Sequence, residues 1–106
     1  METRPYGELP LVFKVCGKVF AELYPEAGNY KITLKCEPTL ADLYRRQFTD
    51  AVVRGYHCPR ALWPYWNTVY FDKVPHDLIK RMIDHSYLEV VKKLTKVQRA
   101  GLPQNE

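Results

Sequence analysis

The sequence predicts a two-layer α+β domain, in which a five-stranded antiparallel sheet carries helices on one face. Two observations predict this class. Several short stretches rich in β-branched and aromatic residues alternate apolar with polar side chains, as half-buried antiparallel strands do. The stretch of residues 75–94 instead repeats apolar residues at helical spacing. The expected order is three strands, a helix, two strands and a C-terminal helix.

The first three strands follow one another through short turns. Residues 11–16 alternate apolar side chains onto one face, Gly17 and Lys18 supply a turn, and residues 19–24 return as the second strand of a hairpin. Residues 30–36 show the clearest alternation in the chain. Their expected buried face carries Tyr30, Ile32, Leu34 and Cys36, and their expected exposed face carries Lys31, Thr33 and Lys35.

A helix and two strands occupy the middle of the chain. We expect a helix over residues 40–48, with Thr39 as its N-cap and Asp42 at the acidic position of a capping box. Residues 51–53 and 66–71 are rich in strand-forming residues and predict the fourth and fifth strands. The stretch between these strands is expected to be a loop.

The C-terminal helix has the strongest pattern. Pro75 fits its first turn, and Thr95 with Gln98 resembles the capping box of a short further helix that ends near Gly101 and Pro103. One apolar stripe runs along the long helix: Ile79, Met82, Ile83, Tyr87, Val90, Val91 and Leu94.

Length and composition limit the class of protein. A chain of 106 residues predicts one domain, with residues 1–8 and 101–106 as tails. No apolar stretch is long enough to span a membrane, and the N-terminus lacks the apolar core of a signal peptide. The three cysteines are widely spaced, which favours a reducing cytoplasm. We therefore expect a cytoplasmic protein without a membrane partner.

The chain offers little for metal or covalent chemistry. Its cysteines and His57 lack the closely spaced ligand pairs of metal sites, and we expect no metal and no cofactor. Cys58 lies beside His57 and near Arg60, but no acid that would orient the histidine is identifiable. No glycine-rich phosphate loop is present. The sequence therefore predicts a protein that is not an enzyme.

The basic and aromatic residues carry the best functional signal. The net charge is +4, the surplus of bases falls in residues 41–106, and aromatic residues including Tyr65 crowd the loop before Trp66. Cations bind phosphates and rings stack on bases. Lysines on a polar sheet face are also ordinary solvated residues, and cations at a helix C-terminus match its dipole. The candidate nucleic-acid-binding residues are Lys14, Lys18, Lys31, Lys35, Tyr56, His57, Arg60, Trp63, Lys92 and Lys93.

Four blocks of the sequence resemble one family. They are residues 13–21 (FKVCGKVFA), residues 32–38 (ITLKCEP), residues 55–70 with their GYH and WNTVY motifs, and residues 78–94. Together they resemble the MmcQ/YjbR family of small bacterial proteins. The resemblance implies an α-β3-α-β2-α fold of the secretion-chaperone-like or CyaY-like type. It also implies a DNA-binding role through a double-wing arrangement.

The chain departs from this family pattern in two places. The family has a helix before the first hairpin, whereas only about ten residues precede the hairpin here, so either this helix is missing or the chain begins late. Without the helix, part of the apolar face of the sheet would lie open, which favours a dimer. The link between His57 and Trp66 is longer than is typical of the family, and Tyr65 stands where a histidine commonly precedes the tryptophan.

The sequence leaves three functions open. We expect a non-enzymatic binding protein, monomeric or homodimeric, whose leading partner is DNA or another nucleic acid. The first alternative is a chaperone-like protein-interaction module. The second is a small-ligand site in the aromatic loop between Tyr56 and Trp66. An exposed apolar patch, a continuous positive surface or a closed aromatic concavity would distinguish them.

Overall fold

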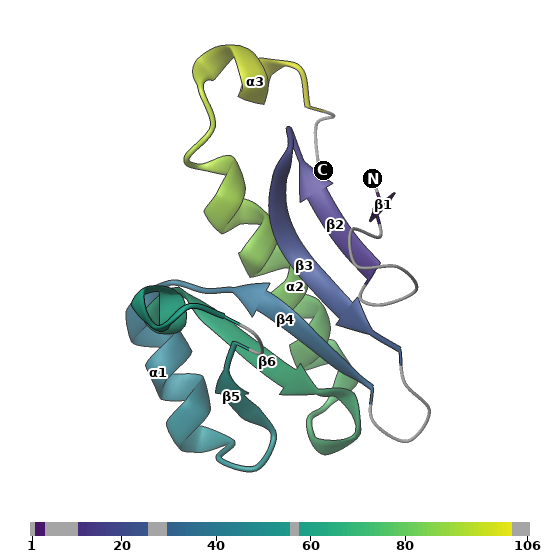
Figure 1. Cartoon of the computed structure of the whole chain (residues 1–106), viewed down its shortest axis with the longest axis vertical. Helices are drawn as coiled ribbons and strands as arrows, with labels where there is room; N and C mark the ends of the chain where they lie inside the picture. The colour runs from purple at the N-terminus through teal and green to yellow at the C-terminus, as the bar shows by residue number, and fades with distance from the viewer. Residues whose placement is uncertain (1, 4–10, 26–29, 56–57, 103–106) are drawn as a thin grey trace.

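The computed structural model describes residues 2–3, 11–25, 30–55 and 58–102, and it confirms the predicted α+β class. One antiparallel sheet, with strand order β1-β2-β3-β4-β6-β5, packs one face against helices α1 and α2 (Figure 1). Its elements are β1 (Glu2–Thr3), β2 (Leu11–Val15), β3 (Lys18–Tyr24), β4 (Lys31–Lys35), α1 (Pro38–Gln47), β5 (Val52–Arg54), the 3₁₀ helix η1 (Arg60–Tyr65), β6 (Trp66–Tyr70), the 3₁₀ helix η2 (Phe71–Lys73), α2 (His76–Val91) and α3 (Lys96–Ala100).

All predicted strands and helices are present, with three additions, of which the 3₁₀ helix η2 replaces the turn expected after the last strand. The short strand β1 pairs with β2, in a segment expected to be part of a tail. The 3₁₀ helix η1 occupies part of the expected loop before β6. The capping box of Thr95 and Gln98 is present at α3. None of the helices in the described part of the chain is long and apolar enough to cross a membrane.

The core lies between the sheet and the two helices. Ile32, Leu34 and Val69 of the central strands pack against Ile79 and Met82 of α2, in one cluster of buried residues. The C-terminal end of α2 continues this layer, where Val90 and Leu94 pack on Val15 and Phe20 of the first hairpin. The apolar stripe of α2 is thus confirmed as its sheet-facing side.

Alternation predicted which residues of β4 share a face, but it did not predict the burial of all of them. Ile32, Leu34 and Cys36 are buried as expected, but Tyr30 is 45% exposed because it precedes the strand and lies beside Phe71. On the opposite face Lys31 and Thr33 are also buried.

The neighbouring strands explain why the polar face of β4 is buried. Lys31 lies in register between Tyr24 of β3 and Tyr70 of β6, and its ammonium is 5.1 Å from the centroid of the Tyr24 ring. Thr33 pairs with Thr68 through a hydroxyl–hydroxyl hydrogen bond of 2.7 Å. Side chains of the flanking strands β3 and β6 help to cover both faces of β4. The alternation of its own residues therefore did not predict which of its side chains are exposed.

Helix α1 begins two residues earlier than predicted. Its N-cap is Glu37, whose carboxylate accepts hydrogen bonds from the backbone N–H of Thr39, at 2.7 Å for one oxygen and 3.1 Å for the other. Pro38 occupies the first helical position, where its lack of an N–H costs nothing. The predicted capping role of Thr39 was therefore wrong, because the proline fixes the start of the helix ahead of it.

Ser86 joins α2 to the place where β3 and β4 separate. The pairing of the two strands runs from Tyr24 and Lys31 to Ala21 and Leu34, and beyond it the strands diverge (Figure 1). There the hydroxyl of Ser86 accepts from the backbone N–H of Lys35 at 2.8 Å. It also donates to the carbonyl of Phe20 on β3 at 2.5 Å. The Ser86 hydroxyl therefore replaces the backbone hydrogen-bond partners that β3 and β4 would offer each other if they remained paired here.

Candidate nucleic-acid interface

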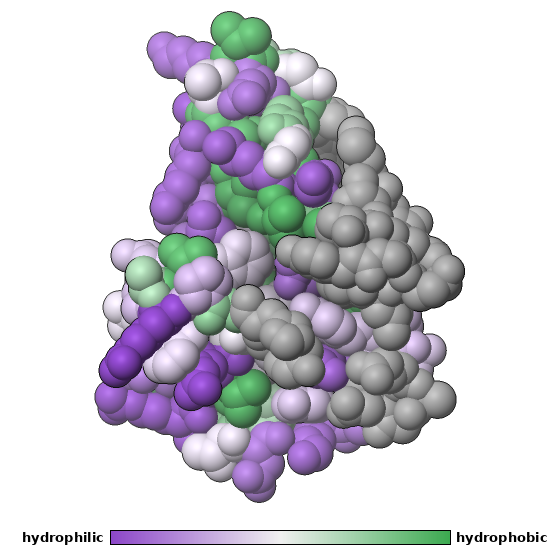
Figure 2. Space-filling model, viewed as in Figure 1, coloured by the Kyte–Doolittle hydropathy of each residue, from purple (hydrophilic) through white to green (hydrophobic). Residues whose placement is uncertain are grey.

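Four of the predicted lysines come together at one end of the sheet. Lys18 begins β3, Lys35 ends β4, and Lys92 and Lys93 follow the last residue of α2. The charges of the other three all act on Lys35. Figure 2 shows hydrophilic residues along the side of the molecule where the C-terminal part of α2 lies. We call Lys18, Lys35, Lys92 and Lys93 the lysine cluster.

The field inside the lysine cluster is positive. Burial lowers the pKa of Lys35 most, and the charges of Lys93, Lys18 and Lys92 lower that pKa further. Glu89 raises it, but the Glu89 carboxylate already pairs with Lys92 at 2.9 Å. A bound anion would therefore relieve repulsion between these cations.

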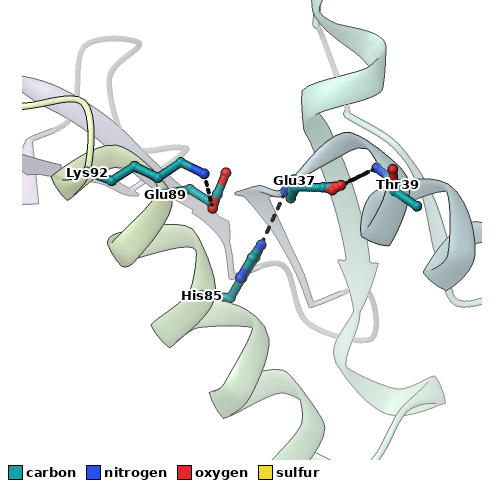
Figure 3. Close-up of polar contacts among 5 residues, drawn as sticks. All are labelled: Glu37, Thr39, His85, Glu89 and Lys92. Carbon is teal, nitrogen blue, oxygen red and sulfur yellow. Dashed lines mark hydrogen bonds and ion pairs between the residues drawn. The ribbon is translucent and has the colours of Figure 1, made fainter.

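The Glu89 side of the cluster is held in place by the junction between β4 and α1. One turn before Glu89 on α2, the Nε2 atom of His85 accepts a hydrogen bond of 3.2 Å from the backbone N–H of Glu37 (Figure 3). The Glu37 side chain in turn caps α1 at Thr39. Together with Ser86, these contacts fix the end of β4 against α2, so the position of Lys35 is set by the fold.

A second group of cations surrounds Trp63 on η1. The guanidinium carbon of Arg54 lies 4.0 Å from the Trp63 ring centroid, and that of Arg60 lies 5.5 Å away. The indole N–H donates to the Cys58 carbonyl at 2.9 Å, and Arg45 donates to the Trp63 carbonyl at 3.0 Å. Trp63 and Arg60, both predicted as binding residues, thus lie together, with the indole held by this chain's own groups.

Gly55 lies in close contact with Trp66 and Cys58. Gly55 is buried, and a Cβ atom added to it would lie 2.9 Å from the Trp66 Cβ and 3.0 Å from the Cys58 Cβ. Gly55 also donates its N–H to the Trp66 carbonyl. Any other residue at position 55 would force Trp66 or Cys58 to move. The close contact of Gly55 with these two residues therefore fixes the position of η1 relative to the sheet.

Tyr65 lies beside the lysine cluster. The residue is 39% exposed, and the centroid of its ring lies 5.9 Å from the Lys93 ammonium. Tyr65 ends η1, two residues after Trp63. Tyr65 belongs to the aromatic loop before Trp66 but is not among the binding residues predicted from the sequence. The signal that could have found it is its place between a proline and a strand.

The remaining predicted residues do not join this surface. Lys31 is only 4% exposed and lies against Tyr24, at the opposite end of β4 from the lysine cluster, so the exposure predicted for its side chain was wrong. Lys14 is half-buried on β2. Tyr56 and His57 lie outside the described residues.

A small pocket lies between the sheet and the two helices. Asn67 donates through its amide nitrogen to the Ala41 carbonyl at 3.1 Å, while its amide oxygen is buried with no hydrogen-bond partner in the described part of the chain. Burial raises the pKa of the Cys36 thiol to about 11 and raises the pKa of Tyr44. The pocket is lined by Leu34, Lys35, Cys36, Tyr44, Asn67, Val69, Met82 and His85.

The described residues offer no cluster of metal ligands, and two of the three cysteines have thiols of low reactivity. Burial raises the pKa values of both Cys36 and Cys58, which favours their protonated, unreactive forms. Among residues 2–3, 11–25, 30–55 and 58–102, no three histidine, cysteine or acidic side chains lie close enough to share a metal ion. The arrangement gathers cations whose charges suit an anion, and burial favours the protonated form of the Cys58 thiol.

Known proteins are similar to this chain in sequence. The YjbR family model matches residues 1–89. The uncharacterised protein YjbR of Escherichia coli strain K12 is 34% identical over 92 residues, which cover 86% of this chain and 75% of that protein. YjbR of Escherichia coli O157:H7 matches to the same extent.

Two crystal structures are similar to this fold. The Deinococcus radiodurans protein DR2400, which carries the domain DUF419, superposes with a TM-score of 0.85 at 32% identity, over 97% of this chain and 78% of that one. A protein from Pseudomonas syringae gives a TM-score of 0.65 at 21% identity, over 80% of this chain and 81% of that one. The latter likeness concerns the fold alone.

Proposed function

The chain belongs to the YjbR family, and we propose that it is a non-enzymatic protein that binds nucleic acid through backbone phosphates at the lysine cluster. The observation that carries the proposal is the convergence of Lys18 at the start of β3, Lys35 at the end of β4 and Lys93 after α2, where burial and then the neighbouring charges lower the pKa of Lys35. The positive field of these charges favours an anion, and a row of lysines suits a polyanion.

The chemistry of the surface favours contacts to phosphate. Lysine ammonium groups are point charges that bind phosphate oxygens without reading the base sequence. The cluster is built from the ends of two strands and the turn that follows α2, so its cations do not lie along the exposed face of a helix. Binding should therefore depend weakly on sequence and strongly on salt.

The proposed function also concerns the cellular compartment of the protein. The three cysteines, Cys16, Cys36 and Cys58, are free thiols, which suits a reducing compartment. The named relatives come from bacteria, and we propose that this protein acts in a bacterial cytoplasm, where nucleic acid is accessible.

The test is fluorescence anisotropy of labelled random oligonucleotides, duplex and single-stranded, from low to physiological salt. The variant Lys18→Gln with Lys93→Gln should bind more weakly and flatten the log–log salt slope on duplex by about two units. The matched control is Lys73→Gln with Lys80→Gln. It removes the same charge near the start of α2, about 18 Å along the helix from Lys92.

The two variants separate a site from a general charge effect. Equal weakening by both would mean that net charge alone binds the oligonucleotide, and the lysine cluster would lose its role. No binding by the unaltered protein at micromolar concentration and low salt would reject nucleic acid. That result would favour the chaperone-like protein-interaction alternative.

A further inference from the structure

We propose that the nucleic acid bound at the lysine cluster is single-stranded and that a base stacks on the ring of Tyr65. This inference rests on the proposed function and names its substrate class. It starts from the exposed ring of Tyr65, which lies 5.9 Å from the Lys93 ammonium and so beside the lysine cluster. Aromatic rings beside backbone-binding cations are the combination that single-strand binding proteins use.

The backbone holds Tyr65 in place before any ligand arrives. The Tyr65 carbonyl accepts a hydrogen bond of 2.8 Å from the backbone N–H of Cys36, at the end of β4. Pro64 precedes Tyr65 and restricts the backbone there, and Trp66 pairs in register with Lys35 in the sheet. Because the backbone of Tyr65 is already fixed, only the two side-chain torsions of the ring remain to be ordered when a base stacks on it.

The other aromatic residues of the described chain are less suited to stacking. The Trp63 ring is half-buried, with Arg54 at 4.0 Å from its centroid and its N–H bonded to Cys58. Trp66 is half-buried on β6. Tyr30 is exposed, but it lies about 17 Å along β4 from Lys35.

The position of the Tyr65 ring beside the Lys93 ammonium favours single-stranded over duplex nucleic acid. A base that stacks on Tyr65 brings the phosphate of its own nucleotide toward Lys93 and the rest of the lysine cluster. In a duplex the faces of the bases are covered by their stacked neighbours, so the ring has no face to contact. Tyr65 should therefore add affinity for single strands and none for duplex, whereas the lysines contribute to both.

The experiment compares Tyr65→Ala with two matched variants on three probes. The probes are a labelled random 12-nucleotide DNA, the duplex formed with its complement, and a 12-nucleotide abasic strand with phosphates but no bases. Tyr65→Phe keeps the ring, and Tyr30→Ala removes an exposed tyrosine remote from the cluster. Circular dichroism and thermal unfolding confirm that each variant is folded.

Tyr65→Ala should weaken binding of the single strand by about 5- to 150-fold and change duplex binding less than twofold. Tyr65→Phe and Tyr30→Ala should bind all probes as the unaltered protein does. The abasic strand should bind the unaltered protein and Tyr65→Ala equally, because it offers no base to stack.

Two results would overturn the inference and separate it from the proposed function. If Tyr65→Ala leaves single-strand binding unchanged while the loss of Lys18 and Lys93 weakens it, phosphate binding stands and base stacking at Tyr65 falls. The same conclusion follows if Tyr65→Ala weakens duplex and single strand equally. If no probe binds at low salt, both proposals fall together.

Discussion

At the scale of single residues, Cys16 occupies a backbone conformation that is unusual for its side chain. The turn between β2 and β3 consists of Cys16 with φ 48° and Gly17 with φ +78°. Positive φ at both central residues is the signature of a two-residue type I′ turn, in which Asn-Gly is strongly preferred. Sequence alternation predicted this turn one residue later, because cysteine is not a turn residue.

Replacing Cys16→Asn should therefore stabilise the protein. Asparagine tolerates positive φ better than cysteine, so we expect the free energy of unfolding to rise by roughly 0.5–1 kcal/mol in urea denaturation. Cys16→Ala, which removes the thiol without improving the conformation, is the matched control. A gain of the same size in both variants would show that the thiol, and not the turn, sets the stability.

Cys36 should make the stability of the protein fall at alkaline pH. Its pKa is raised from 9.0 to about 11 by burial, so between these pH values the folded protein keeps a proton that the unfolded chain releases. The free energy of unfolding should drop by about 2 kcal/mol from pH 8 to pH 11 because of this thiol. The difference between the unaltered protein and Cys36→Ala, measured by denaturation at each pH, isolates the effect from other titrating groups. A pH-independent difference would contradict it.

At the scale of elements, Ser86 is the contact that couples α2 to both β3 and β4. Ser86→Ala leaves the Lys35 N–H and the Phe20 carbonyl without this buried partner. The expected loss is about 1–3 kcal/mol, reduced by a few tenths because alanine favours the helix.

Leu88→Ala, two residues along α2, is the control for Ser86. Leu88 is 59% exposed, so its truncation should change the free energy of unfolding by no more than about 0.5 kcal/mol. Urea denaturation with unchanged m-values is the measurement. Equal effects at both positions would mean that the hydroxyl of Ser86 does not hold the separated strands.

At the scale of the whole molecule, the lysine cluster should favour oligonucleotide binding and at the same time lower the stability of the folded protein. Lys18 is exposed and lowers the pKa of Lys35, so Lys18→Gln removes repulsion from the folded protein. We expect a small stabilisation, about 0.5 kcal/mol or less, at low salt together with weaker oligonucleotide binding. In 1 M NaCl, where the Debye length is about 3 Å, the stabilisation should vanish. A gain that persists in 1 M NaCl would show a cause other than charge.

The order and type of the longer strands and helices, and most of the core, could be predicted from the sequence without the fold. Ile32 and Leu34 alternate as one face of a strand, and Ile79, Met82 and Val90 repeat at helical spacing, because these periods belong to local backbone geometry. The sequence also supplied the candidate lysines, since their charge is visible without any fold.

Only the tertiary structure decided which of those candidates form a site. Lys31 and Lys35 are equivalent in the alternation of one strand, yet Lys31 is buried beside Tyr24 while Lys35 joins Lys93 from a distant helix. Tyr65 gains its place from a hydrogen bond to Cys36, 29 positions earlier in the chain. The physical reason is that burial and electrostatic fields depend on neighbours in space, which sheet pairing and helix packing bring together across long stretches of sequence.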